Sequence, residues 1–363
     1  MRERSTVVLI VADPQLGGGT TVVDALAREY LNAGWNVEVI TDASGPLVSQ
    51  LRAAGATVHT VAFFSQADFA SAVLGIRRIV SNAQPTLVHT HGSRALWFSV
   101  LVPRSVPSMH TVHGYHYLHR AGLQRRIGTI LERFANRRID TTVFVSRQDE
   151  SLARTHRLLR PTARSVVILN GVALDQTDEP SPRRHGTVAF VSRFEHQKDP
   201  LLAVQVAALL PDRIKLLMIG DGSLRGEVNS AINDAGLKAR VELTGALPRH
   251  EMLRQLQSCD ALLLTSRWEG LPLTPMEAMH LGVPVVAPRM AATEELIEHS
   301  VDGMLVDGRD PRDFAAAITS ATQPKEHDRL AAAGRRSAET RFSWASCWAQ
   351  HRAVVERLTG VAS

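Results

Sequence analysis

Residues 6–41 read TVVLIVADPQLGGGTTVVDALAREYLNAGWNVEVIT, and this stretch predicts one β-α-β unit. An apolar run at residues 7–12 precedes a turn of three glycines and a helix-length segment at residues 20–32. Gly34 is a typical helix stop, and residues 37–41 form a second short apolar run. Because two strands joined through a helix pair in parallel, the stretch predicts a parallel sheet.

The same alternation continues along the chain on both sides of a polar stretch. Residues 175–185 are polar and contain prolines, so they predict a linker after the apolar residues 166–169. The expected fold is therefore α/β, with two doubly wound domains in sequence. Strand candidates lie at residues 57–62, 86–90, 108–112 and 141–145 before the linker, and at 187–192, 214–219, 241–244, 261–265, 283–287 and 303–306 after it.

Length, charge and cysteine content agree with a cytoplasmic two-domain protein. A chain of 363 residues exceeds the size at which one hydrophobic core stops growing. The net charge of +5 is spread along the chain, so nucleic acid is not an expected partner. Cys259 and Cys347 form no CxxC pair, which fits a reducing compartment. The first apolar run is too short for a membrane span and lacks a signal-peptide cleavage site.

The segment EGLPLTPME, residues 269–277, follows a predicted strand and predicts the start of a helix. Thr274 is expected to cap this helix, Pro275 suits its first turn, and Glu277 occupies the capping-box position. The first amides of such a helix form an anion site, and a diphosphate is a natural occupant. The structural alternative is that Glu277 only caps the helix and Glu269 is a solvated loop charge.

Glu269 and Glu277, with seven residues between them and AMHLGVPVVA after them, are similar to the E-x7-E signature of the retaining family 4 glycosyltransferases. The resemblance covers nearly the whole chain, because further motifs of that family follow in the expected order. They are Gly17-Gly18-Gly19, LVHTHG at 87–92, TVHG at 111–114, residues 140–146, ILNGV at 168–172, VSRF at 191–194 with Lys198, IGDG at 219–222, and the closing Phe342-Ser343-Trp344.

The resemblance implies the GT-B arrangement, in which two Rossmann-like domains face a central cleft. The first domain, expected at residues 1–174 with a C-terminal helix at about 345–363, would hold the acceptor. The linker would be residues 175–185. The second domain, at residues 186–344, would hold the nucleotide sugar. The sequence departs from the family at three positions. Ser192 and Asp199 stand where glycine is common, and Ala173 stands where an aspartate often follows the Asn-Gly-Val motif.

The resemblance also implies roles for individual residues. Arg193 and Lys198 would neutralise the diphosphate, Glu277 would bind the ribose hydroxyls, and Leu247 would lie at the base-binding edge. His113 and Glu269 would act as catalytic residues beside the transferred sugar. The remaining expectations are backbone contacts of Gly18, Gly270, Leu271, Pro272 and Leu273 with the donor, and an acceptor side formed by Gly17, Gly19 and His116.

Neither a cofactor nor a metal ion is expected. The sequence contains no D-x-D pair, which is the carboxylate arrangement that many other glycosyltransferases use to hold a metal. His110, His113, His116 and His119 recur every three residues, but the run passes from a strand into a loop, so these side chains need not converge.

The segment Tyr117 to Arg138 mixes apolar residues at near-helical spacing with arginines. We expect the apolar stripe to pack against the first domain. The alternative is peripheral contact with the inner face of the plasma membrane. The apolar residues are Leu118, Leu123, Ile127, Ile130, Leu131 and Phe134, and the arginines are Arg120, Arg125, Arg126, Arg133, Arg137 and Arg138.

The expected activity is transfer of a hexose or N-acetylhexosamine from a nucleoside diphosphate sugar to an acceptor hydroxyl. A UDP-sugar is favoured as donor and GDP-mannose is next. The acceptor is a saccharide, a lipid-linked molecule or a small molecule, in polysaccharide, glycolipid or glycoside biosynthesis. Two alternatives stay open, a nucleotide-sugar epimerase of the same fold and an inactive nucleotide-sugar-binding subunit.

Overall fold

The computed structural model describes residues 4–15, 17–43, 45–63, 69–119, 122–173 and 184–361. The chain forms two compact units. Unit 1 consists of Met1–Gly171 with Trp344–Ser363, and unit 2 is Val172–Ser343. Most of the expected linker, residues 175–183, lies outside the described residues, as does Arg120. No helix within the described ranges is both long and apolar enough to cross a membrane.

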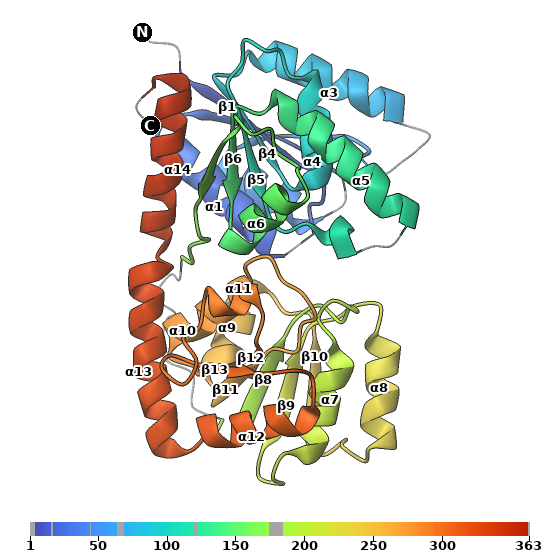
Figure 1. Ribbon diagram of the computed structural model, residues 1–363, viewed down its shortest axis with the longest axis vertical. Coiled ribbons are helices and arrows are strands. Elements are labelled where there is room, and N and C mark those ends of the chain that lie inside the picture. Colours follow the sequence, from blue (N-terminus) through green and yellow to red (C-terminus); the bar gives the residue numbers. More distant parts are fainter. Residues whose placement is uncertain are drawn as a thin grey trace. The chain divides into compact units, whose positions relative to one another are not determined.

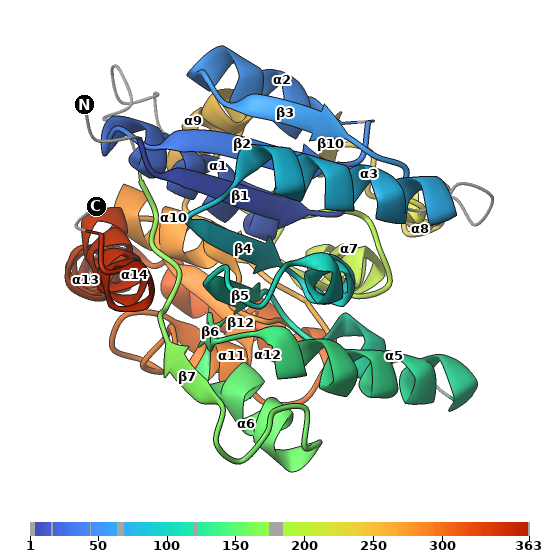
Figure 2. The ribbon, with the colours of Figure 1, turned by 90° about the horizontal axis from the view of Figure 1, so that it is seen from above.

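Unit 1 is built on a parallel sheet of seven strands in the order β3-β2-β1-β4-β5-β6-β7 (Figures 1 and 2). The chain starts in the middle of the sheet, runs to one edge, and returns past β1 to build the other half. The strands β1 and β4 at the centre are buried along their whole length because helices cover both faces. The bounds are β1 (Thr6–Val11), β2 (Asn36–Thr41), β3 (Thr57–Thr60), β4 (Leu87–His91), β5 (Ser108–Val112), β6 (Thr141–Phe144) and β7 (Arg164–Val167).

Helices α3 and α5 lie on one face of this sheet, and α1 and α14 lie on the other (Figure 1). The helix α14 returns to unit 1 after the whole of unit 2. Trp344 Nε1 donates a hydrogen bond to Glu29 Oε1 on α1 at 2.8 Å, and Trp348 packs edge-on against Tyr30. The helices of unit 1 are α1 (Gly18–Asn32), α2 (Pro46–Ala54), α3 (Phe69–Ala83), α4 (Ser93–Trp97), α5 (Gly122–Ala135), α6 (Arg147–Thr155) and α14 (Trp344–Thr359), with short 3-10 turns η1 (Phe98–Leu101), η2 (His116–His119) and η3 (Asn136–Arg138).

Unit 2 has a parallel sheet of six strands in the order β10-β9-β8-β11-β12-β13. Its main core lies between this sheet and the helices α7, α8 and α12. The strands are β8 (Thr187–Val191), β9 (Lys215–Ile219), β10 (Val241–Gly245), β11 (Ala261–Leu263), β12 (Val285–Pro288) and β13 (Met304–Val306). The helices are α7 (Pro200–Leu209), α8 (Arg225–Asp234), α9 (Arg249–Gln257), α10 (Leu273–Leu281), α11 (Ala291–Glu294), α12 (Pro311–Ala321) and α13 (Pro324–Arg341).

Gly220 and Gly222 are required by close backbone contact between two loops. Gly220 has φ 145°, and a Cβ there would lie 1.8 Å from the carbonyl oxygen of Ser192. A Cβ on Gly222 would lie 2.6 Å from the carbonyl oxygen of Phe194. These glycines therefore let the loop after β9 pack on the loop after β8.

The apolar residues 166–169 begin inside β7, whose register with β6 pairs Thr141 with Arg164. The expectation that the apolar stripe packs against the domain is wrong for four of its six residues. Leu123, Ile127, Ile130 and Phe134 are exposed by 47–70%, whereas Leu118 is buried and Leu131 is half-buried. The helix instead buries Gly128, Glu132 and Ala135, the small and polar positions of its other face.

Candidate functional site

Two loops of unit 2 lie side by side and hold most of the candidate donor residues. They follow β8 and β11, which pair in parallel through Val188 and Ala261. The hydroxyl of Thr265 donates to the carbonyl oxygens of Lys198 and Asp199, at 2.8 Å each. The amide of Arg267 donates to the carbonyl oxygen of Gln197 at 2.7 Å. The sheet thus brings residues about seventy positions apart into two loops that are hydrogen-bonded to each other.

Lys198 and Glu269 form an ion pair between these two loops. The Lys198 Nζ atom lies 2.5 Å from Glu269 Oε1, and the exposed fractions of the two side chains are 19% and 6%. The hydroxyl of Ser266 donates to the same carboxylate oxygen at 2.6 Å. A nearly buried carboxylate needs such partners, since leaving it unpaired would cost several kcal/mol. Glu269 is therefore not the solvated loop charge of the structural alternative.

Asp199 supports this pair from the residue after Lys198. Its φ is 49°, in the left-handed region, and its side chain is nearly buried. Asp199 Oδ2 accepts from Arg309 Nη2 at 2.6 Å and lies 2.7 Å from Arg267 Nη2. Arg309 also donates to the carbonyl oxygens of Thr265 and Ser266. The cluster of Asp199, Arg267 and Arg309 therefore fixes the backbone on both sides of the Lys198–Glu269 pair.

The helix α10 begins earlier than expected. Its first residue is Leu273 and its N-cap is Pro272, so Thr274 is not the cap and the N-cap side chain makes no hydrogen bond to the first turn. Proline at 272 already has a φ of −71°, and the Leu273 side chain is buried, which together start the helix at this point. The uncapped amides of its first turn form a candidate anion site.

Glu277 does not cap α10 either. Its side chain is 4% exposed, and its Oε1 atom accepts a hydrogen bond from Arg249 Nη2 at 2.6 Å. Burial raises the pKa of this carboxyl group, and the Arg249 guanidinium opposes the rise. No described residue donates a hydrogen bond to the second oxygen, Oε2. That oxygen can accept a hydrogen bond from a ligand hydroxyl.

The other candidates of unit 2 lie around these residues. Arg193 is exposed beyond β8, and no described residue makes a hydrogen bond or ion pair with its guanidinium. Its charge lowers the pKa of Glu195, after larger contributions from hydrogen bonds to Ser223. Gly270 and Leu271 are buried, and Leu247 is half-buried after β10.

The glycine turn and His113 are adjacent in unit 1. The helix α1 has Gly17 as its N-cap and begins at Gly18 without a side-chain cap. A Cβ on Gly19 would lie 3.3 Å from His113 Cγ, so the glycine makes room for the imidazole ring. His113 follows β5 and is half-buried, whereas His116 is exposed on η2. The structure thus groups Gly19 with His113.

His113 belongs to a cluster of histidines on β4, β5 and α14. His91 Nδ1 lies 3.1 Å from His113 Nε2, and the two rings stack. Burial lowers the pKa of His113 to about 4, and nearby His351 and His116 add to the lowering. One nitrogen of each hydrogen-bonded pair must donate and the other accept, so neutral rings fit this contact. The ring of His89 lies 4.0 Å from His91 and 6.3 Å from His351.

The histidine repeat does not converge on one point. His110 is fully buried and contacts the hydroxyl and carbonyl oxygens of Thr90 at 2.9 and 3.1 Å, while His113 contacts His91. The side chain of His119 lies outside the described residues. In the part of the chain that the structure describes, no three His, Cys, Asp or Glu side chains are grouped to hold a metal ion.

Three contacts of the candidate site could not be predicted from the sequence. Arg249 reaches Glu277 from the start of α9, 28 residues earlier in the chain. Arg309 reaches Asp199 across 110 residues. His91 reaches His113 from the neighbouring strand. Each pairing depends on strand order, so only the HTHG segment of residues 89–92, at the end of a predicted strand, gave a hint of a site residue.

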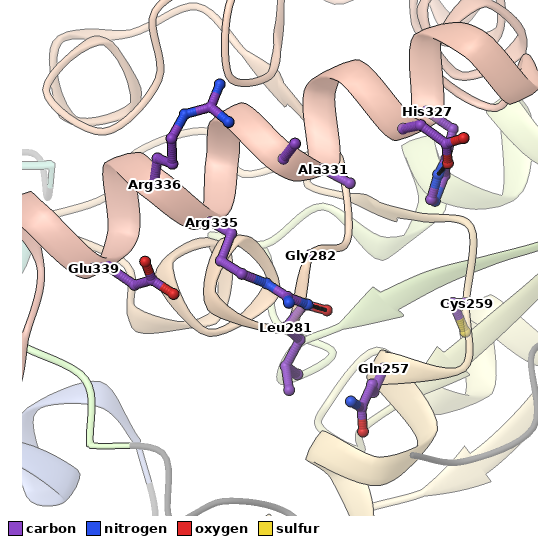
Figure 3. Close-up of a pocket in the computed structure, with 11 residues that line it drawn as sticks. Gln257, Cys259, Leu281, Gly282, His327, Ala331, Arg335, Arg336 and Glu339 are labelled. Atoms are coloured by element: carbon purple, nitrogen blue, oxygen red, sulfur yellow. Dashed lines mark hydrogen bonds and ion pairs between the residues drawn. The ribbon is translucent and has the colours of Figure 1, made fainter.

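A hollow in unit 2 lies away from these residues (Figure 3). It is lined by side chains of α13 and by Leu281 and Gly282 at the C-terminal end of α10. Arg335 Nη2 crosses it and donates to the carbonyl oxygen of Leu281 at 3.1 Å. The candidate anion site is at the opposite end of α10, about 12 Å along the helix axis. The hollow therefore does not belong to the candidate site.

Comparison with known proteins identifies the family. Residues 16–176 match the family model described as Glycosyltransferase Family 4, and residues 174–337 match the model described as Glycosyl transferases group 1. The chain belongs to glycosyltransferase family 4. This family 4 member is a glycosyltransferase that uses nucleotide sugars.

Two curated relatives are similar to parts or most of the chain. The amylovoran biosynthesis glycosyltransferase AmsK of Erwinia amylovora is 32% identical over 181 residues, which are 47% of this chain and 44% of that protein. The UDP-Gal:alpha-D-GlcNAc-diphosphoundecaprenol alpha-1,3-galactosyltransferase of Escherichia coli is 25% identical over 327 residues, 81% of this chain and 82% of that protein.

The family 4 chain also resembles solved structures. Anabaena Alr3699/HepE in complex with UDP-glucose gives a TM-score of 0.84 at 20% identity, over 98% of this chain and 100% of that one. This likeness and the two parallel-sheet units show the GT-B fold.

Proposed function

We propose that this glycosyltransferase moves a hexose or N-acetylhexosamine from a UDP-sugar to an acceptor hydroxyl with retention of the anomeric configuration. The observation that carries the proposal is the Lys198–Glu269 ion pair, which joins the loop after β8 to the loop between β11 and the start of α10. A cation and the first backbone amides of a helix are groups that bind a diphosphate, and the carboxylate of Glu269 can accept hydrogen bonds from a sugar, which supports the proposal.

Stabilisation of the leaving diphosphate is the main demand of the reaction. An ammonium group has three N–H donors, so the bond of Lys198 to Glu269 leaves two for phosphate oxygens. The guanidinium of Arg193, which has no partner among the described residues, supplies a second cation. Preorganised donors of this kind stabilise charge that develops in the transition state. Gly18, at the start of α1, and residues 270–273 would add backbone contacts.

Glu277 is proposed to bind the ribose. Its Oε1 is held by Arg249, so Oε2 is fixed in direction and can accept from a ribose hydroxyl. Leu247 is proposed to contact the base. Glu269 and the neutral His113 are proposed to contact the transferred sugar, with Gly17, Gly19 and His116 on the acceptor side.

The bond between the anomeric carbon and the diphosphate oxygen breaks, and a bond to the acceptor oxygen forms on the same face of the sugar. The acceptor proton passes to the leaving phosphate. We propose that no metal ion takes part, because Lys198, Arg193 and the amides of α10 supply the positive charge that a metal would otherwise provide.

The choice of donor draws on the similar proteins. The Escherichia coli relative is named for UDP-galactose, and the similar Anabaena structure holds UDP-glucose. GDP-mannose is the second donor to test. The acceptor would be a saccharide, a lipid-linked molecule or a small molecule. A cytoplasmic location is part of the proposal, since both cysteines are free and buried.

The test measures donor binding and turnover with a panel of UDP- and GDP-sugars, with and without EDTA. We expect one nucleotide series to raise the melting temperature of the native protein, and EDTA to leave that rise unchanged. Loss of a charge-assisted hydrogen bond costs roughly 1.5–3 kcal/mol, so Lys198→Ala, Arg193→Ala and Glu277→Ala should each weaken donor binding about 10- to 100-fold.

Lys238→Ala is the matched control, because Lys238 is an exposed lysine of unit 2 away from the site. Arg193→Ala separates loss of binding from loss of folding. The Arg193 side chain is exposed and has no described partner, so its removal should leave the fold intact. If all three variants bind the donor like the parent, the assignment of the donor site is wrong. Conversion of the donor sugar without any acceptor would instead support the epimerase alternative.

A further inference from the structure

The outer face of α5 carries an apolar stripe that is exposed in the described part of unit 1. Leu123, Ile127, Ile130 and Phe134 are spaced four, three and four residues apart, so they share one side of the helix. Their exposed fractions are 70%, 47%, 63% and 58%. Isolated exposed apolar residues are ordinary, but four in one row mark an interaction surface.

The opposite face of α5 is firmly attached, so the stripe is presented by a fixed helix. A Cβ on Gly128 would lie 2.7 Å from the Tyr117 ring, which means that only glycine lets the ring pack this closely. Ala135 packs with Leu96 and Ile139 in a small core. The four side chains of the stripe are therefore exposed on a helix whose other face is packed against unit 1.

Positive charge gathers beside the stripe. A hollow along α5 is lined by Arg125, Arg126, Thr129, Ile130, Arg133 and His156, with Gly122 at its end, and none of these described lining residues is acidic. Arg133 is held in place because Nη2 and Nε donate to the carbonyl oxygens of His156 and Arg157, at 2.8 and 3.1 Å. Arg126 has no described partner for its charge.

We propose that α5 docks this protein on an anionic lipid bilayer. The four apolar side chains would enter the acyl region, and lipid phosphates would occupy the arginine-lined hollow. Guanidinium groups bind phosphate oxygens bidentately, and an amphipathic helix with arginines beside its apolar face is suited to the membrane interface. An anionic bilayer offers an apolar interior directly beside a layer of phosphate groups, which matches an apolar stripe directly beside three arginines. The proposal rests on this surface alone and does not depend on the transfer chemistry.

The test is flotation of the full chain with lipid vesicles. Vesicles of phosphatidylcholine alone are compared with vesicles containing equal parts of phosphatidylcholine and phosphatidylglycerol, at low and high salt. We expect binding to the anionic vesicles at low salt, at least tenfold weaker binding to neutral vesicles, and weakening by salt. Each arginine near an anionic surface strengthens binding roughly fivefold.

Two variants separate the contributions of the surface. Ile130→Gln with Phe134→Gln should reduce vesicle binding at least tenfold, and Arg125→Gln with Arg126→Gln should reduce it more than tenfold and remove most of the salt dependence. The matched control is Leu74→Gln with Arg77→Gln on α3, where the same residue types are exposed in the same unit. The control should bind like the parent. Melting temperatures confirm that all three proteins fold.

Several results would overturn the proposal. One is no binding to anionic vesicles, and another is equal loss in the control. A third is binding of inorganic phosphate that depends on Arg125 and Arg126 while vesicle binding does not. A fourth is a change of oligomeric mass in the Ile130 and Phe134 variant without a change in vesicle binding, because the stripe would then join copies of the chain.

Discussion

Asp199 is held in a backbone conformation that L-residues avoid, and two arginines hold it there. Its φ of 49° would suit glycine, yet its carboxylate bonds to Arg309 and pairs with Arg267. The left-handed region costs most L-residues roughly 1–2 kcal/mol. The arginine contacts offset this cost and fix the carbonyl of Lys198 against Thr265.

Substitutions of Asp199 should separate backbone strain from charge. Asp199→Ala loses both arginine contacts and keeps an unfavourable φ, whereas Asp199→Gly loses the contacts but relieves the strain. We expect the glycine variant to be about 1 kcal/mol more stable than the alanine variant in urea unfolding. Both should bind donor at least fivefold more weakly than the parent, because Lys198 is less firmly placed. Equal stability of the two variants would contradict the role of the backbone conformation.

Gly19 and Gly17 give a matched pair for testing His113. A methyl group on Gly19 would press on the His113 ring, while nothing lies within 4 Å of a Cβ on Gly17, whose φ of −178° any residue can adopt. We expect Gly19→Ala to lower turnover at least tenfold with little change in donor affinity. Gly17→Ala should leave donor affinity nearly unchanged and should lower turnover less than Gly19→Ala, because its methyl group does not press on His113. A large loss of donor affinity with Gly19→Ala would mean that the turn binds the donor and does not chiefly position His113.

The resemblance to family motifs singled out Lys198, Glu269 and Glu277 as candidate site residues. It could not predict which side chains contact them. The E-x7-E spacing carries no information on Arg249, because the contact depends on how α9 packs beside α10. The same limit applies to Asp199, which stands where glycine is common, because its contact with Arg309 lies 110 residues away in the sequence. Ion pairs across a sheet edge are set by tertiary packing, and local pattern does not contain them.

At the scale of elements, β4, β5 and α14 share a buried set of histidines that makes unit 1 sensitive to acid. Burial lowers the pKa of His110 to about 3 and of His351 to about 4, and holds those of His89 and His91 well below the ordinary value. His113 is lowered to about 4. These rings are neutral in the fold and become charged at higher pH in the unfolded chain.

The sign of the pH effect follows from these shifts. Between the unfolded pKa of about 6.5 and the folded values, the unfolded chain binds more protons, so stability falls as pH falls. Each histidine costs up to about 1.4 kcal/mol per pH unit in this window. We expect hydrogen exchange in β4 and β5 to be slow and constant above pH 7, after correction for intrinsic rates, and the protection to collapse between pH 6.5 and 4.

His351→Gln provides the control for the histidine set. The side-chain amide can still donate to the carbonyl of Cys347, as His351 Nδ1 does at 3.0 Å, but it does not titrate. The free energy of unfolding should then depend less steeply on pH, by the equivalent of about one proton taken up on unfolding. An unchanged slope would show that His351 does not contribute.

Strands that are continuous apolar runs could be predicted from the sequence. The start of a helix and the side of a helix that packs on the domain could not, because both depend on contacts with other elements. β1 and β5 are continuous buried runs, and they lie where the sequence indicates. The start of α10 was misplaced because Pro272 and the buried Leu273 outweigh the capping propensity of Thr274. The face of α5 was misassigned because periodicity shows that a helix is amphipathic, but not which side is attached.

At the scale of the whole molecule, unit 1 is made of two distant pieces of chain. The helix α14 buries Val354 and Val355 and packs against Tyr30 of α1. Val355→Ala should destabilise unit 1 by about 1–3 kcal/mol through the cavity it leaves. Hydrogen exchange should speed up in α1 and α14 while unit 2 is unaffected. Arg352→Ala, on the exposed side of the same helix, should change neither. Equal acceleration in unit 2 would show that the units unfold together.

This split has a consequence for synthesis on the ribosome. Residues 344–359 are translated only after the whole of unit 2, so the first unit to begin emerging is the last to be completed. Until then the surface around Tyr30 lacks its helical cover, and unit 2 can close its own core first. The order of folding is then the reverse of the order of translation, and a nascent unit 1 is a natural client for chaperones.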